Sequence, residues 1–237
     1  MRTLVIDCTT QALSIALVGE DMRPDNAHSN DDGSNDDGSN YRYQLMGRGH
    51  AEMLVPMIQE MLAGRRADAI AVDVGPGSFT GIRVGIAAAR ALGFAWGVPV
   101  TGYDCLSLCA AMVRDDRARQ DGIAADEPIT IVMTGGHGEL FWQRFEADTL
   151  HILHPLTSTP VADLARDLGD ARLHGSGAAT LVEARGWGEA SDCLPDARRY
   201  SLLSPARRAL PPVAIYGREA DAKPMASAVP AISAAGA

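Results

Sequence analysis

The chain has 237 residues, is 46% hydrophobic and carries a formal net charge of −9. This length and composition fit a globular protein with one large domain or two lobes. The acidic balance argues against direct nucleic-acid binding, which needs clustered lysines and arginines. No apolar run reaches the roughly 20 residues that cross a bilayer, and the N-terminus lacks the features of a signal peptide. We therefore expect a cytoplasmic protein without a membrane segment.

Short apolar runs at residues 3–7 and 12–18 predict an opening β-hairpin, and a third strand is expected near residues 41–45. Between them, residues 29–40 repeat Asp, Asn, Gly and Ser. Such side chains bury no apolar area, so this insert is predicted to be a disordered loop. The order of strands predicts that the insert extends a hairpin without changing the fold.

The segment from His50 to Ala63 has the periodicity of a helix that ends at Gly64. It has two neighbouring apolar stripes, which make a broad face. One interpretation is that this face only covers a sheet. The other is that it contacts a partner protein, a role for which adaptable methionines are suited. The candidate contact residues of the methionine stripe are Met53, Met57 and Met61.

A strand-like run at residues 69–74 leads through a glycine turn into a predicted helix at residues 82–94. Small residues recur every four positions along this helix. A glycine inside a helix costs roughly 1 kcal/mol relative to alanine, so the pattern requires the close approach of a second backbone. That backbone belongs either to this chain or to a partner. The stripe consists of Gly81, Gly85, Ala89 and Gly93.

The second half of the chain repeats the order of strand, hairpin and helix after a break near residues 101–104. In chain order the expected elements are a strand at 98–101, a helix at 106–113, a surface connection at 114–127, a hairpin at 129–145, a helix at 161–168 and a strand at 172–174. A second glycine turn and helix follow. The last residues, 224–237, are rich in Ala, Ser, Pro and Gly and are predicted to form a flexible tail.

Two turns suggest a weak nucleotide-binding site. A glycine turn between a strand and a helix exposes backbone N–H groups to anions, and the hairpin turn after the first strand is polar. However, neither the P-loop pattern nor the dinucleotide pattern fits these glycines, and a plain polar hairpin loop is the alternative. The residues concerned are Asp7, Thr9, Thr10, Gly75 and Gly77.

No catalytic or metal-binding set is visible in the sequence. His50 is followed at the fourth position by Leu54, so the HxxxH arrangement of a helical metal site is missing. The sequence also lacks the GxSxG nucleophile elbow. We therefore expect no intrinsic metal, no intrinsic cofactor and no catalytic residue in this chain.

Three segments together resemble the TsaB (YeaZ) family. They are VIDCTTQALSIAL, GHAEMLVPMIQEML and the long run that contains GPGSFTGIRVG. The resemblance is close over residues 1–112, weak through the second half, and returns at residues 215–224. This family is the bacterial partner subunit of the machinery that makes threonylcarbamoyl-adenosine in tRNA.

The resemblance implies an α/β, two-lobed actin-like (ASKHA, sugar kinase/Hsp70-like) fold in which each lobe is a mixed sheet flanked by helices. The expected division is an N-terminal lobe at 1–103 and a C-terminal lobe at 104–223. The resemblance also implies a scaffold that binds the catalytic paralogue TsaD, with the ATPase TsaE joining them, and contacts tRNA only through the complex. ATP or ADP and a metal ion are then expected on the partner subunits, and a homodimer is expected when the chain is alone.

The chain departs from the family's pattern in the acidic insert and in the turn Thr134-Gly135-Gly136-His137, where relatives usually carry a DAR-type turn. Two alternatives to the scaffold are a self-contained actin-fold ATP-dependent phosphotransferase and a glycoprotease-like metallopeptidase. ATP binding by the isolated chain would indicate the first, and a bound metal would indicate the second.

Overall fold

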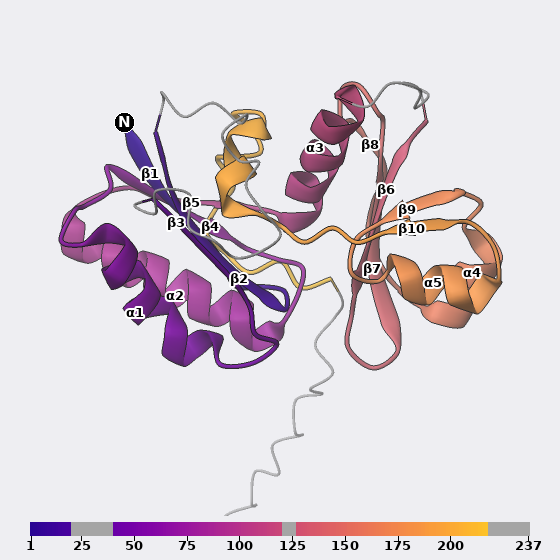
Figure 1. The fold of residues 1–237 in the computed structure, drawn as a ribbon, viewed down its shortest axis with the longest axis horizontal. Helices are drawn as coiled ribbons and strands as arrows, with labels where there is room; N and C mark the ends of the chain where they lie inside the picture. The colour runs from indigo at the N-terminus through magenta and orange to yellow at the C-terminus, as the bar shows by residue number, and fades with distance from the viewer. Residues whose placement is uncertain (20–39, 120–126, 218–237) are drawn as a thin grey trace, which may run out of the picture.

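The computed structural model describes residues 1–19, 40–119 and 127–217. The predicted tail at 224–237 and all but the last residue of the predicted insert lie outside these ranges. The described residues form two lobes, each built on a five-stranded sheet, with further helices between the sheets and on their outer faces (Figure 1). Each sheet places the strands in the same sequence, so the second lobe repeats the topology of the first.

The first sheet has the order β3-β2-β1-β4-β5. Its first three strands are antiparallel neighbours, whereas β4 and β5 run parallel to β1. Successive side chains of a strand point to opposite faces, and on β1 both faces are buried: Leu4 and Ile6 pack in one core cluster and Val5 in another. The strands are β1 (Arg2–Asp7), β2 (Ala12–Gly19), β3 (Tyr41–Leu45), β4 (Ala69–Asp73) and β5 (Val100–Tyr103).

Helices α1 (His50–Leu62) and α2 (Phe79–Trp96) cover the outer face of the first sheet (Figure 1). Their inward side chains join Leu4 and Ile6 in one hydrophobic cluster. Helix α2 begins at the N-cap Ser78, whose side chain accepts a hydrogen bond from the Gly81 N–H. It ends at Gly97, which has the left-handed conformation typical of helix C-termini.

The second sheet has the order β10-β9-β6-β7-β8, and the short helices α4 and α5 cover its outer face (Figure 1). Its strands are β6 (Ile129–Thr134), β7 (Glu139–Phe145), β8 (Ile152–Pro160), β9 (Arg172–His174) and β10 (Glu189–Ser191). The helices are α4 (Val161–Asp167) and α5 (Ala178–Arg185).

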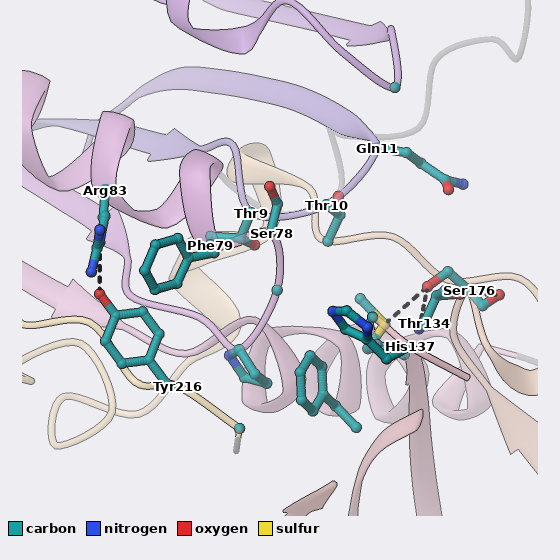
Figure 2. A pocket seen from close by; sticks show the side chains of 18 residues that line it. Thr9, Thr10, Gln11, Ser78, Phe79, Arg83, Thr134, His137, Ser176 and Tyr216 are labelled. Atoms are coloured by element: carbon teal, nitrogen blue, oxygen red, sulfur yellow. Dashed lines mark hydrogen bonds between the residues drawn. The ribbon is translucent and has the colours of Figure 1, made fainter. Parts of the chain in front are cut away.

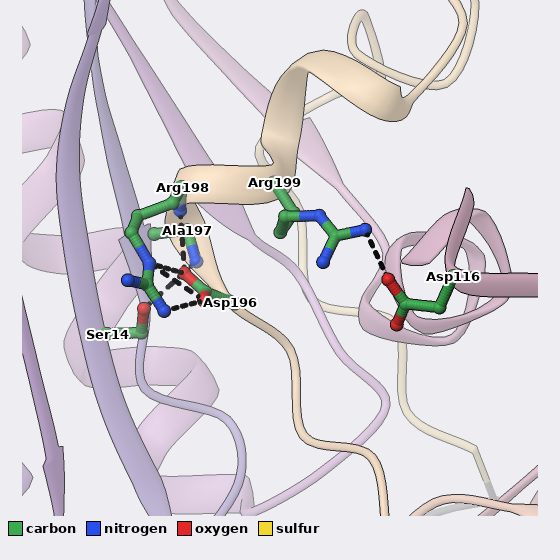
Figure 3. Close-up of polar contacts among 6 residues, drawn as sticks. All are labelled: Ser14, Asp116, Asp196, Ala197, Arg198 and Arg199. Carbon is green, nitrogen blue, oxygen red and sulfur yellow. Dashed lines mark hydrogen bonds and ion pairs between the residues drawn. The ribbon is translucent and has the colours of Figure 1, made fainter. Parts of the chain in front are cut away.

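The inner faces of the two sheets share one core with helix α3 (Cys105–Ala118) and the short 3₁₀ helix η2 (Ala197–Leu202). Polar contacts hold η2 in place (Figure 3). The Ala197 N–H donates to Ser14 Oγ on β2 at 2.9 Å, and Arg199 donates to Asp116 on α3 at 2.9 Å. Arg199 is buried and also bonds Asp115. Helix η2 thus ties the first sheet to α3.

After η2 the chain returns to the first lobe. Leu210 pairs with Gly102 beside β5, and the Ile215 N–H donates to the Val74 carbonyl. The Arg90 guanidinium on α2 donates to the Pro212 carbonyl. Residues 210–215, which the sequence analysis assigned to the second lobe, therefore lie against the first sheet and α2.

The predicted strands at 3–7, 12–18 and 41–45 and the predicted helices α1 and α2 are confirmed, as is the repeated order in the second half. Two predictions need correction. Residues 114–118, expected in a surface connection, continue helix α3, because their charged side chains lie on its accessible side. Residues 152–160, which lie between the predicted hairpin and helix and were assigned no element, form β8, which pairs antiparallel with β7. Within the described ranges, no helix has the length and apolarity needed to cross a membrane.

Candidate functional site

The outward faces of α1 and α2 carry several exposed apolar side chains on the first lobe. Helix α2 has no acidic residue, and its only basic ones are Arg83 and Arg90. Its outward positions otherwise carry Phe79, Thr80, alanines and Phe94, and the Phe94 side chain is 92% exposed. On α1, Met53 and Val55 are 39% and 42% exposed. Polar side chains on the exposed side of α1 accompany these apolar ones, namely Glu52, Gln59 and Glu60.

The inner face of α2 contains the small-residue stripe. All four of its residues are buried, and so are Met57 and Met61 on α1. Six of the seven predicted contact residues therefore face the chain's own sheet, and Met53 alone is exposed. The prediction that the stripe Gly81, Gly85, Ala89 and Gly93 contacts a partner is corrected: it is an internal packing surface.

The glycines of this stripe are small because the first sheet lies directly beneath them. A Cβ atom at Gly81 would lie 2.0 Å from the Cys8 carbonyl oxygen. At Gly85 it would meet Cys8 Sγ at 2.7 Å, and at Gly93 it would meet Val100 Cγ2 at 2.3 Å. The close backbone that the periodicity predicted is thus the turn after β1 and the neighbouring strand β5.

A second candidate site is a cavity of about 790 Å³ between the lobes. Figure 2 shows that the turn after β1 and the start of α2 line one side, and the β6–β7 turn lines the other. Several aromatic rings complete the wall. The lining residues are Thr9, Thr10, Gln11, Gly47, Pro76, Gly77, Ser78, Phe79, Arg83, Met133, Thr134, Gly135, Gly136, His137, Phe141, Ser176, Tyr216 and Gly217.

The structure brings part of the predicted nucleotide site to this cavity. Thr9, Thr10 and Gly77 line it, as does the unusual turn at residues 134–137. Gly75 and Asp7 do not: both are buried behind the wall. Gly75 has a φ of 102° and packs against the Ile215 carbonyl, so it shapes the turn before α2.

Asp7 and Asp73 form an enclosed acidic pair beneath Thr9. Their exposed fractions are 0% and 1%. The Thr9 hydroxyl donates to Asp73, and the Tyr103 hydroxyl donates to Asp7 Oδ2 at 3.2 Å. Burial raises the pKa of both carboxyl groups, and the neighbouring Asp73 raises that of Asp7 further. The pair therefore holds a proton more readily than exposed carboxylates do, and neither side chain lines the cavity.

At the cavity mouth, Arg83 lies between two aromatic rings. Its guanidinium carbon is 3.6 Å from the centre of the Phe79 ring, a cation–π contact. Its Nε donates to the Tyr216 hydroxyl at 3.0 Å (Figure 2). Among the described residues no carboxylate forms an ion pair with Arg83. The mouth thus carries a positive charge that remains available to an anion.

The sequence analysis missed most of this cavity. Phe79 and Arg83 lie one helical turn apart on α2, whereas Phe141 lies on β7 and Tyr216 lies near the end of the described chain. Nothing in the local sequence indicates that these last two side chains meet α2. Only Ser176 had a signal, because it lies in the second glycine turn. Within the described ranges, no group of three or more His, Cys, Asp or Glu side chains is placed to hold a metal ion.

Comparison with known proteins identifies similar chains. The family model described as "TsaD: tRNA N6-adenosine threonylcarbamoyltransferase" matches residues 44–166. The Escherichia coli K12 protein named "tRNA threonylcarbamoyladenosine biosynthesis protein TsaB" is 29% identical over 65% of this chain. That match spans only 59% of the relative's length. The Mycobacterium tuberculosis H37Rv protein named "Uncharacterized protein Rv3421c" is 31% identical over 78% of this chain and 82% of its own.

A solved structure shares the fold. The crystal structure of an uncharacterized Pseudomonas aeruginosa protein with similarity to peptidase YEAZ superposes with a TM-score of 0.65. It is 25% identical and covers 92% of this chain and 99% of its own. The expected actin-like fold, with two mixed sheets flanked by helices, is thereby confirmed. From its sequence matches and its fold, the chain belongs to the TsaB (YeaZ) family.

Proposed function

We propose that this chain takes part in the synthesis of threonylcarbamoyl-adenosine in tRNA, as a non-catalytic subunit that binds and activates a TsaD-type enzyme. The observation that carries the proposal is the apolar outward face of α1 and α2, with Phe94 at 92% exposure. Exposed aromatic and methionine side chains are enriched where proteins bind one another. The catalytic subunit is a paralogue with related helices, which makes it a suitable occupant of this face.

The composition of the chain supports an indirect relation to tRNA. Its net charge of −9 disfavours strong contacts to phosphates. In this proposal the TsaD-type partner and a TsaE-type ATPase hold the RNA, the nucleotide and the metal ion. The chain supplies the surface on which the catalytic subunit is held in its active arrangement.

The same surface predicts self-association when the partner is absent. Two copies that join through α1 and α2 would remove Val55 and Phe94 from water. We propose that the free chain is a homodimer that exchanges for the heterodimer. Light scattering after size exclusion at micromolar concentration should give twice the chain's 25.0 kDa mass, and a monomer at that concentration would contradict this part.

The decisive experiment is copurification with the TsaD-type protein from the same cell. Phe94→Asp places a charge among the exposed apolar side chains in the last turn of α2, where the side chain makes little contact with the chain's own core, so the variant should still fold. We expect this variant to lower the affinity for the partner at least tenfold and to reduce threonylcarbamoyl-adenosine formation in proportion.

The matched control is Trp187→Asp, which changes an aromatic side chain of 45% exposure on the second lobe. It should bind the partner as the unchanged chain does. Equal affinity of the Phe94→Asp variant, with an unchanged melting temperature, would rule out α2 as the contact surface. A substitution at Gly85 cannot test this surface, because Gly85 packs on Cys8 and a larger side chain there would disrupt the fold.

The phosphotransferase alternative has weaker support. It requires a carboxylate that faces the ligand and holds magnesium, whereas Asp7 and Asp73 are enclosed and hydrogen-bonded beneath Thr9. Calorimetry with ATP and magnesium tests it on the isolated chain. A peptidase would need a metal, and elemental analysis of the purified protein tests that idea.

A further inference from the structure

The four cysteines of the chain all lie in its described ranges, and all are free thiols. Two of them are hydrogen-bonded to the protein's own backbone. The buried Cys8 thiol donates to the Gly81 carbonyl at 3.1 Å. The buried Cys105 thiol donates to the Pro76 carbonyl at 3.0 Å. Because a reagent in solution does not reach either sulfur, we expect both to stay reduced in the folded chain.

The other two cysteines, Cys109 and Cys193, meet although 84 positions separate them in the sequence. Cys109 lies on α3 and is fully buried, and its Sγ is 4.0 Å from the Cys193 carbonyl oxygen. The two thiols also form a hydrogen bond, and this bond, followed by burial, raises the pKa of Cys109 above its ordinary range. The core that the two sheets share thus contains a direct contact between two thiols.

Cys193 is the accessible member of the pair. It is only partly buried, and it lies in the connection between β10 and η2, which has no regular secondary structure. Since neither a strand nor a helix fixes this backbone, small rotations there can bring its sulfur to the bonding distance of about 2.05 Å that a disulfide requires. A reagent therefore reaches Cys193 first, and Cys109 is the second thiol behind it.

The surroundings of the pair do not activate either thiol. Reactive cysteines commonly lie beside a cation. Here Tyr43 on β3 interacts electrostatically with Cys109, and its charged neighbours include Asp192, Asp196 and Arg198. Arg198 is bonded to Asp196 at 2.7 Å, which leaves no free cation among these groups. We therefore expect the pair to react over minutes to hours rather than within seconds.

We propose that Cys109 and Cys193 form an oxidisable thiol pair, which a hydroperoxide converts into a disulfide. With hydrogen peroxide, the Cys193 sulfur attacks one peroxide oxygen, the O–O bond breaks, and water leaves with the thiol proton, so that a sulfenic acid forms at Cys193. The Cys109 sulfur then attacks the Cys193 sulfur, the S–O bond breaks, and a second water leaves with the Cys109 proton. The two sulfurs lose two electrons in total, and one peroxide molecule gains them.

The disulfide would secure helix η2. Asp196, the N-cap of η2, follows Cys193 by three residues, and the helix contacts Ser14 on β2 and Asp116 on α3 (Figure 3). A covalent bond from α3 to the preceding connection adds to these polar contacts. It also closes the chain between positions 84 apart, which removes conformational freedom from the unfolded state. We expect oxidation to raise the melting temperature by about 10 °C.

The test starts from the reduced full chain at micromolar concentration, treated with one molar equivalent of hydrogen peroxide. Two of the four thiols should disappear, peptide mapping should find Cys193 linked within the same chain to the segment that carries Cys105 and Cys109, and dithiothreitol should restore both thiols. Retention of all four thiols, or a bond between two chains, would overturn the proposal. A bond that leaves the melting temperature unchanged would overturn the stabilising role.

Single substitutions identify the two sulfurs. Cys193→Ser, at a partly buried position, should form no internal disulfide and show no rise in melting temperature on oxidation. The matched control is Cys105→Ala, one helical turn before Cys109 on α3 and equally buried, which should form the bond as the unchanged chain does. Loss of the bond in folded Cys105→Ala, with retention in Cys193→Ser, would overturn the assignment.

The order of the two steps has its own test. In Cys109→Ala the sulfenic acid at Cys193 has no second thiol to attack it, so dimedone, which captures sulfenic acids, should label Cys193. Labelling of Cys109 in Cys193→Ser instead would reverse the order.

These experiments use the chain without a partner and are independent of the proposed function. Cys193→Ser should still copurify with the TsaD-type protein. Phe94→Asp should lose that partner and still form the disulfide, because Phe94 is on the outer face of α2. If folded Phe94→Asp lost both properties, the two conclusions would not be separate.

Discussion

The inner and outer faces of helix α2 differ sharply although they belong to the same eighteen residues. The inner face has Gly81, Gly85, Ala89 and Gly93 in contact with the first sheet, and all are buried. The outer face has Arg83, Ala87, Arg90 and Phe94, all exposed. Small residues thus mark the face that is already packed, and the large apolar side chain marks the face that still lacks a neighbour.

This difference shows what a small-residue period reports. It indicates that a backbone approaches the helix closely, but it does not identify the chain to which that backbone belongs. Here the close backbone belongs to this chain, because a Cβ at Gly81 would overlap the chain's own Cys8 carbonyl. The apolar composition of the outer face is then the evidence for a partner, and the glycines are evidence for the fold.

Gly81→Ala breaks the inner face most severely. The added Cβ would lie 2.0 Å from a backbone oxygen, which cannot move without displacing the turn after β1. We expect a loss of about 3 kcal/mol or more in the free energy of unfolding, or failure to fold. Urea denaturation followed by circular dichroism measures it.

The control for this substitution is Gly136→Ala in the β6–β7 turn. A Cβ there meets no atom within 4 Å, and Gly136 is exposed. Its free energy of unfolding should change by less than about 0.5 kcal/mol. Equal stability of the two variants would show that α2 lies farther from the sheet than the structure places it.

Much of the fold followed from local patterns. Short apolar runs predicted β1 and β2, the periodic apolar stripes predicted α1, and the glycine turn with its small-residue period predicted α2. Strand β8 was missed because Pro155, Thr157 and Ser158 give it little apolar alternation; its pairing with β7 determines it. Helix η2 was missed for a related reason, since Ser14 and Asp116, distant in sequence, hold it in place.

Ala89→Leu and Ala87→Leu compare the two faces with the same chemical change. Ala89 is fully buried, and a larger side chain there forces the helix away from the sheet. We expect a loss of about 2 kcal/mol. Ala87 is exposed, and leucine has nearly the helix propensity of alanine, so its variant should change by less than about 0.5 kcal/mol. If denaturation curves showed a larger loss of stability for Ala87→Leu than for Ala89→Leu, the assignment of the inner and outer faces would be reversed.

The candidate sites were less accessible to sequence reasoning than the fold. The turn residues Thr9, Thr10 and Gly77 were predicted because a polar or glycine turn has a local signal. Tyr216 and Phe141 line the same cavity although they lie far apart in the sequence. Tyr216 reaches it because the chain returns to the first lobe, where the Ile215 N–H bonds the Val74 carbonyl. The sequence alone could not show which stripe of α1 faces outward, because both stripes are apolar. The exposed fractions in the structure distinguish them.

The acidic pair lies on the face of the first sheet opposite to α2, beside Tyr103, and Asp73→Asn tests how well that region is enclosed. Burial raises the pKa of Asp73 above its ordinary value of 3.8. Asp73 in the folded chain therefore keeps a proton that the same side chain in the unfolded chain releases above about pH 4. Stability is therefore greatest below this pH and falls as the pH rises towards neutrality.

Asparagine at position 73 has no proton to lose but retains the hydrogen-bonding shape. Its oxygen accepts the Gly75 N–H bond now made by Asp73 Oδ1 at 2.9 Å, and its amide faces the Thr9 hydroxyl. The variant should gain on the order of 1 kcal/mol over the unchanged chain at pH 8 and little or nothing at pH 4. Parallel stability curves across this range would mean that water reaches Asp73, and that this region is open rather than sealed.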